Sequence, residues 1–170
     1  MSTEPRVGVL MGSDSDWSVM QEAGKVFKQF GIGFEMKVTS AHRTPERTHT
    51  YVSEAPGRGI KVLICGAGAA AHLAGVVASG TNLPVIGVPL AATDLDGLDA
   101  LLSTVQMPGG IPVASMAIGK AGAKNAALFA CQILALSDPE LATALNTYRT
   151  DMAASVAKKD AALQSKLADL

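Results

Sequence analysis

The stretch Ile60-Lys61-Val62-Leu63-Ile64-Cys65, followed by Gly66-Ala67-Gly68, indicates the class of fold. Apart from Lys61, its first six residues are apolar, which is typical of a central parallel strand that helices cover on both faces. The glycines after Cys65 open a turn, and a helix of small residues is expected to follow and to end near Ser79. We therefore predict a buried strand over 60–65 in an α/β protein.

Apolar runs on both sides of this stretch alternate with segments of helical periodicity. We expect further strands over residues 6–11, 34–38, 84–88 and 113–118. We expect helices between the turn at 12–16 and Gly31, and over 45–55, 98–105 and 120–136. The last of these is apolar almost all round and is expected to be buried. This alternation predicts one parallel sheet with helices on both faces, in a single α/β domain over residues 1–170.

A long last helix is predicted over about 138–170, with Asp138 as its N-cap and Pro139 as its first helical residue. Its apolar positions recur with helical period at Leu141, Leu145, Tyr148, Met152, Val156, Leu163 and Leu167. At ~1.5 Å per residue, such a helix is longer than the diameter of a small domain. We expect a neighbouring subunit to cover the part of this stripe that its own core cannot bury. The alternative is a helix whose last turns fray.

The composition limits the classes of partner. The net charge is −1, and aromatic residues make up 4% of the chain, so neither a basic surface nor a base-stacking surface for nucleic acid is expected. The start, MSTEPR, has no feature of a signal peptide, and no apolar run approaches the ~20 residues of a membrane span. We expect a cytoplasmic protein that binds no nucleic acid and no membrane.

Cysteine and histidine usage points away from metal and redox chemistry. Cys65 and Cys131 lie in apolar stretches and form no CxxC pair, which is typical of buried thiols in a cytosolic protein. The three histidines show no spacing typical of a zinc site. We therefore expect no metal.

Three turns that follow predicted strands carry most of the candidate chemistry, and in a parallel sheet they share one edge. The turn Ser40-Ala41-His42-Arg43-Thr44-Pro45 holds an imidazole that can exchange a proton near neutral pH. It also holds Arg43, whose guanidinium suits phosphate or carboxylate. Alone, this turn is as consistent with a solvated helix start as with a site.

The other two turns allow similar alternatives. In Gly12-Ser13-Asp14-Ser15-Asp16, free N–H groups at a helix start suit phosphate, and a carboxylate suits ribose hydroxyls. Helix capping is the simpler interpretation, and we favour it for Asp14, whereas Asp16 is open. In Gly66 to Leu73, small residues let the backbone approach a small carboxylate or carbon dioxide. His72 could orient the ligand or the loop, or could be structural.

Together the three turns resemble one known family. Gly-Ser-x-Ser-Asp at 12–16, Ser-Ala-His-Arg-Thr-Pro at 40–45 and Gly-Ala-Gly-x-Ala-Ala-His-Leu at 66–73 are similar to motifs in the catalytic subunit of phosphoribosylaminoimidazole carboxylase. Val-Gln-Met-Pro at 105–108 and Ala-Ile-Gly at 117–119 extend the similarity over nearly the whole chain. The resemblance implies a flavodoxin-like three-layer α/β/α sandwich, a homo-octamer, and no metal or organic cofactor.

The resemblance also implies an activity in de novo purine synthesis. In the bacterial mutase class of this family, N(5)-carboxyaminoimidazole ribonucleotide loses carbon dioxide, which is retained and added to the adjacent ring carbon. By motif, His42 is the general acid/base, Arg43 and Ser40 hold the phosphate, Asp16 takes the ribose, and the Ala67–Ala70 backbone encloses carbon dioxide. The full set of expected substrate-binding residues is Ser13, Asp16, Arg43, Ser40, Ala67, Gly68, Ala69, His72 and Leu73. A transient contact with the ATP-dependent carboxylating enzyme of the same pathway is a further expectation.

Two other functions compete with the mutase. The related direct carboxylase, which takes carbon dioxide itself, typically lacks the Gly-Ala-Gly-x-Ala-Ala-His turn. A non-catalytic flavodoxin-like module binding nucleotide or flavin would leave His42 beside Arg43 unexplained. The sequence departs from the family pattern at Ala69, where Gly is usual, at Ala74, where Pro is usual, and at Ala92, where Ser is common. A methyl group at position 69 could tighten the pocket or forbid a positive φ.

Overall fold

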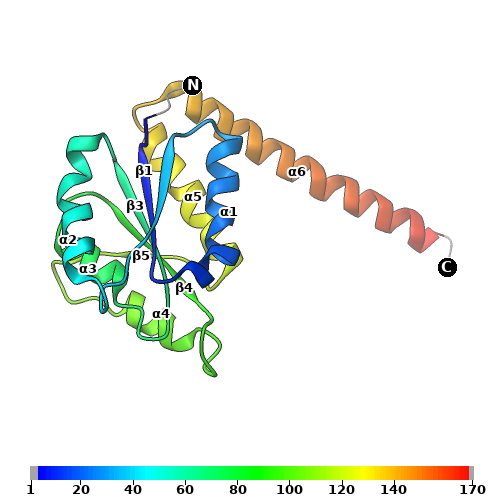
Figure 1. Ribbon diagram of the computed structural model, residues 1–170. Helices are drawn as coiled ribbons and strands as arrows, with labels where there is room; N and C mark the ends of the chain where they lie inside the picture. Colours follow the sequence, from blue (N-terminus) through cyan, green and yellow to red (C-terminus); the bar gives the residue numbers. More distant parts are fainter. Residues whose placement is uncertain (1–3, 169–170) are drawn as a thin grey trace. The chain divides into compact units, whose positions relative to one another are not determined.

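Parallel strands form one sheet in the order β2-β1-β3-β4-β5 within residues 4–168, the part of the chain that the computed structural model describes (Figure 1). They are β1 (Val7–Met11), β2 (Phe34–Val38), β3 (Val62–Gly68), β4 (Val85–Leu90) and β5 (Ala114–Ser115). This is the flavodoxin-like order, in which the chain runs from β1 outward to β2 and then crosses to β3 on the other side. The ends of β1 and β3 therefore flank the switch point, where ligands of such sheets bind.

Helices cover both faces of the sheet (Figure 1). They are α1 (Trp17–Gln29), α2 (Pro45–Glu54), α3 (Leu73–Ser79), α4 (Leu98–Val105) and α5 (Lys120–Ala135), with α6 (Pro139–Ala168) after them. Short 3-10 turns at Asp14–Asp16 and Pro56–Arg58 precede α1 and follow α2. The predicted three-layer α/β/α architecture is confirmed for the part of the chain up to Ile133, which forms one compact unit.

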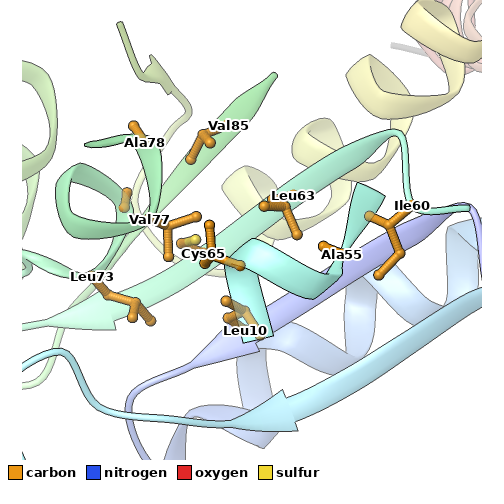
Figure 2. Close-up of a cluster of buried hydrophobic side chains, with 11 residues drawn as sticks. Leu10, Ala55, Ile60, Leu63, Cys65, Leu73, Val77, Ala78 and Val85 are labelled. Carbon is orange, nitrogen blue, oxygen red and sulfur yellow. The ribbon is translucent and has the colours of Figure 1, made fainter. Parts of the chain in front are cut away.

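Alternate residues of the central strands point to opposite layers and explain the apolar run at 60–65. Leu10, Leu63 and Cys65 pack with side chains of α2 and α3, such as Val52 and Val77 (Figure 2). The positions between them face the other layer, where the side chain of Met20 in α1 occupies the space above Gly66. Burial on both faces is what removes polar residues from a parallel strand.

Two predicted strands differ most in their bounds from the structure. The strand predicted over 60–65 is β3 at 62–68, because Gly66, Ala67 and Gly68 continue the ladder opposite the last three residues of β4. The strand predicted over 113–118 is reduced to Ala114–Ser115, which pair with Ile86 and Gly87. Pro112 before it has no N–H to donate, and Gly119 after it turns the chain at a φ of 76°. Because β3 continues to Gly68, the turn that follows it begins at Ala69, which is later than predicted.

The expectation that the helix over 120–136 is buried all round is wrong for the single chain. Its alanines at 123, 126, 127 and 130 are fully buried, whereas Phe129 is 37% exposed. The buried residues recur three and four positions apart and so form one face. Small side chains on that face let the helix lie close to the sheet, and its other face remains uncovered.

A second unit begins at Leu134 and contains α6. Asp138 caps this helix as predicted, because its carboxylate accepts the N–H of Leu141 at 3.1 Å. The last predicted helical residues, 169–170, lie outside the described residues. Exposed fractions of the apolar stripe are high at its distal positions, namely Met152 (46%), Val156 (65%), Leu163 (53%) and Leu167 (52%). No helix within residues 4–168 combines the length and the apolar character needed to cross a membrane.

Candidate active site

The three turns singled out in the sequence meet around one cavity of about 330 Å³ at the carboxyl edge of the sheet. β1 supplies the first turn, β2 the second and β3 the third, so the topology alone brings them together. Every residue predicted to bind or transform the substrate lines this cavity. They are Ser13, Asp16, Ser40, His42, Arg43, Ala67, Gly68, Ala69, His72 and Leu73.

The first turn is held by a capping box. The hydroxyl of Ser13 accepts the N–H of Ser15, and the carboxylate of Asp16 accepts the N–H of Ser13 at 2.9 Å. Ser13 is thus the N-cap and Asp16 completes the capping box, so the preference for Asp14 as a capping residue is wrong. Asp14 is exposed, and its carboxylate instead accepts the Ser13 hydroxyl at 3.2 Å. A cap that also lines the cavity presents one carboxylate edge in a fixed position.

Hydroxyl groups fix the second turn. The Thr44 hydroxyl accepts the N–H of Ser40 at 2.9 Å, and the buried hydroxyls of Thr39 and Thr48 lie 2.8 Å apart. Arg43 then ties this turn to the first one, because its Nη2 atom donates to the carbonyl of Gly12 at 2.9 Å. The guanidinium therefore lies across the gap between the ends of β1 and β2, with Ser40 Oγ 3.5 Å from its Nε atom.

The two cavity histidines contact each other. Nε2 of His42 lies 2.8 Å from Nδ1 of His72, and the rings meet edge to face at a centroid distance of 4.9 Å. A hydrogen bond between two imidazoles requires that one nitrogen carries the proton and the other offers a lone pair. The pair therefore links the second and third turns through a shared proton. Both side chains are exposed in the single chain.

Small residues shape the third turn. A Cβ atom on Gly68 would lie 2.5 Å from Cβ of Ala92, so the end of β3 approaches the segment after β4 too closely for any side chain. Ala69 adopts a φ of 54°, so its methyl group does not forbid a positive φ at this position. Such a backbone strains any residue other than glycine.

The ionisable side chains that line the cavity are the carboxylate of Asp16, the guanidinium of Arg43 and the two imidazoles. Burial raises the pKa of Asp16 above its ordinary value, although the N–H groups of Ser13 and Gly12 and the charge of Arg43 act in the opposite direction. Within the described residues, no group of three His, Cys, Asp or Glu side chains is placed to hold a metal ion. The chemistry these groups offer is proton transfer beside a cation.

Comparison with known proteins agrees with the motifs. Residues 6–155 match the family described as AIR carboxylase. The chain belongs to the AIR carboxylase family. A relative from Pyrococcus abyssi, named N5-carboxyaminoimidazole ribonucleotide mutase, is 59% identical over 148 residues, which are 87% of this chain and 84% of the relative. A relative of the same name from Mycobacterium leprae is 55% identical over 164 residues, covering 96% of this chain and 95% of the relative.

A solved structure confirms the fold of this AIR carboxylase chain. The crystal structure of Treponema denticola PurE superposes with a TM-score of 0.84 at 31% identity, and the match covers 92% of this chain and 97% of that one. The relatives named as mutases are more similar in sequence than this structure is. Membership of the family thus rests on sequence and fold together.

Sequence reasoning missed two features of the AIR carboxylase site. It named His42 and His72 separately and did not pair them, because they are 30 residues apart and no local pattern links them. It also left out Ser15 and Ala41, which line the cavity beside predicted residues. Neighbours of a motif residue in a tight turn usually share its surface, and that signal could have identified them.

A larger hollow of about 810 Å³ lies at the other end of β4 and carries different chemistry. Its lining includes the segment 78–86 together with Ile111 and Phe129, and among its described lining residues none is ionisable. A family reaction that moves a proton needs titratable groups. The smaller cavity with the histidine pair is therefore the candidate active site.

Proposed function

We propose that this chain is an N5-carboxyaminoimidazole ribonucleotide mutase of de novo purine biosynthesis, with His42 as its general acid/base. The observation that carries the proposal is the His42–His72 hydrogen bond beside Arg43 in a cavity built from all three family motifs. The names and identities of the relatives support the activity. The contacts in the cavity support the roles assigned to individual residues.

The reaction needs a proton at two moments. Loss of carbon dioxide from the carbamate leaves its bonding electrons on the exocyclic nitrogen, which must be protonated. Attack of the ring carbon on the retained carbon dioxide then forms a carbon–carbon bond, and the proton on that carbon must leave. The two transfers cancel, so the isomerisation neither consumes nor releases a proton. One imidazole that delivers a proton and later takes one back satisfies both steps.

The contact with His72 gives His42 a partner for these transfers. As the free ring nitrogen of His42 takes up a proton, its Nε2 atom can release one to Nδ1 of His72, and the reverse transfer resets the pair. His72 also fixes the orientation of the His42 ring, since the hydrogen bond at 2.8 Å is short and directed. His72 therefore serves as positioning residue and proton partner of His42.

The remaining roles follow from position and charge. Arg43 and Ser40 bind the phosphate, because a guanidinium and a hydroxyl lie together where β2 ends. Asp16 accepts ribose hydroxyls through the carboxylate oxygen that its own cap leaves free, and Ser13 binds beside it. The backbone of Ala67, Gly68 and Ala69, together with Leu73, forms the wall against which carbon dioxide is held. Ala69 is exposed, so this wall is open in the single chain.

The test follows the carboxyl carbon. The purified protein is incubated without ATP with substrate carrying ¹³C in its carbamate, in an excess of unlabelled bicarbonate. A mutase yields ring-carboxylated product that keeps most of the label. A direct carboxylase yields unlabelled product, and a nucleotide- or flavin-binding module yields none. Either of the last two results overturns the proposal.

We also propose a homo-octamer in the cytoplasm, in which a neighbouring subunit covers α6. The exposed apolar stripe of α6 supports this, because its distal residues from Met152 to Leu167 are about half exposed or more. Deleting the residues after Asp138 should lower the number of subunits per particle measured by light scattering. An unchanged octamer would contradict a role for α6 in assembly. Any contact with the ATP-dependent carboxylating enzyme of the pathway is proposed to be transient.

A further inference from the structure

A second hollow of about 330 Å³ adjoins the cavity that holds the histidine pair. Gly12, Ser13, Ser40 and Arg43 line both, so the inner cavity and this outer hollow are continuous. The outer hollow is further lined by Asp14, Val38, Thr39, Thr44 and Arg47. A ligand bound beside His42 can therefore extend past Arg43 into a second space.

Arg47 is the outer cation of this space. It lies in the first turn of α2, two residues after Pro45, and its side chain is exposed. Within the described residues, no hydrogen bond or ion pair engages its guanidinium. Arg43 differs, because its guanidinium donates to the Gly12 carbonyl. Arg47 thus has all of its donors available to a ligand.

The outer hollow suits an anion better than the inner cavity does. Its lining includes two guanidinium groups, those of Arg43 and Arg47, and one carboxylate, that of Asp14, whereas the inner cavity has Arg43 alone beside Asp16. The hydroxyls of Ser13, Ser40 and Thr44 lie around the same space. Two guanidinium groups with nearby hydroxyls are a usual environment for a phosphate monoester.

We infer that Arg47 binds the phosphate of the substrate from the outer side and selects phosphorylated ribosides over unphosphorylated ones. This inference rests on the proposed function, which places the reacting ring in the inner cavity. With the ring beside His42, the phosphate end lies toward Arg43 and the outer hollow. Arg47 does not line the inner cavity, so it contributes to binding and leaves the proton transfers unchanged.

The first test compares two charge reversals with the same effect on net charge. Arg47→Glu changes the outer hollow, whereas Lys61→Glu changes an exposed position just before β3, at the opposite edge of the sheet. At low ionic strength, Arg47→Glu should lower kcat/KM about threefold to tenfold, with kcat within about twofold of wild type. The loss should shrink near 1 M salt, where the Debye length is about 3 Å. Lys61→Glu should stay within about twofold throughout.

The second test is independent of turnover. Calorimetric titration measures binding of ribose 5-phosphate and of ribose to the wild type, Arg47→Ala and Arg47→Lys. Arg47→Ala should weaken binding of ribose 5-phosphate about threefold to tenfold and leave that of ribose unchanged, while Arg47→Lys recovers part of the loss. If the wild type fails to isomerise the ribonucleotide but this difference persists, the proposed function fails and the phosphate role stands.

Three results would overturn the inference. One is an equal loss of kcat/KM in Arg47→Glu and Lys61→Glu, which would mean a general effect of net charge. Another is a fall in kcat at unchanged KM in Arg47→Glu. The third is binding of ribose 5-phosphate that is as tight in Arg47→Ala as in the wild type, or absent from both proteins.

Discussion

Nε2 of His42 and Nδ1 of His72 lie 2.8 Å apart, although the two residues belong to turns that follow different strands. One proton suffices for this contact, and protonation of both rings would set two N–H donors against each other. The contact therefore requires one ring to donate its N–H and the other to accept it.

His72→Asn tests this pairing. Asparagine can keep a hydrogen bond to His42, but it cannot take up a proton near neutrality. We expect kcat to fall about tenfold or more, since general acid–base groups typically contribute ~100-fold to 10,000-fold and His42 remains in place. Steady-state kinetics measure kcat and KM for the variant. A kcat within about twofold of wild type would show that His72 is structural.

His42→Asn should remove nearly all turnover while keeping the fold and ligand binding. The hydrogen bonds that fix its turn run between Ser40, Thr44 and the backbone and do not involve the imidazole. The expected loss of kcat is at least ~100-fold to 10,000-fold, because one imidazole acts in both half-reactions. Calorimetric binding and an isomerisation assay on the same preparation give the answer. A substantial residual kcat would move the role of proton carrier to His72.

Arg43→Ala should weaken substrate binding more than it slows the bound complex. A hydrogen bond from a charged group is typically worth ~1.5–3 kcal/mol, so KM should rise about tenfold to a hundredfold. Arg43→Lys should recover part of the affinity, because the single ammonium cannot hold both the Gly12 carbonyl and a phosphate as the fork does. Steady-state kinetics separate the two parameters. A defect in kcat alone would contradict a phosphate contact.

Ala69→Gly should stabilise the protein by up to about 1 kcal/mol, since glycine adopts the φ of 54° without the strain of a Cβ atom. Ala70→Gly is the matched control. Ala70 is also exposed, but its φ is not positive. The substitution should therefore destabilise the protein, because glycine increases the conformational entropy of the unfolded chain. Urea unfolding monitored by circular dichroism measures both. Equal effects of the two substitutions would mean that the backbone at Ala69 is not strained.

The thiols of Cys65 and Cys131 should resist alkylation at pH 8 in the folded protein and react on unfolding. Burial raises the pKa of Cys65 far above its usual range and that of Cys131 to about 12, from an ordinary value of 9.0. The unfolded chain loses these protons first as pH rises through 9, so the free energy of unfolding should decrease above that pH. Mass spectrometry after iodoacetamide treatment counts the modified thiols. Rapid native labelling would contradict their burial.

The order of strands and helices could be predicted from sequence, because it depends on local apolar periodicity and on helix ends. The run at 60–65, the cap at Asp138 and the helix over 98–105 are set by residues within a few positions of each other. The sequence also predicts that the three turns lie at one edge of the sheet, because parallel strands joined by helices all end on the same side. These features required no knowledge of distant contacts.

The tertiary structure decided what depends on residues far apart in the chain. β3 runs to Gly68 because β4 lies beside it, and only Ala114 and Ser115 of β5 pair with β4. One face of the helix at 120–135 stays exposed because the sheet covers only the other. The contact of His42 with His72 and the outer hollow at Arg47 arise in the same way. A sequence pattern specifies which residues reach an edge of the sheet, whereas the distances between their side chains are set by the packing of strands that the chain brings together only on folding.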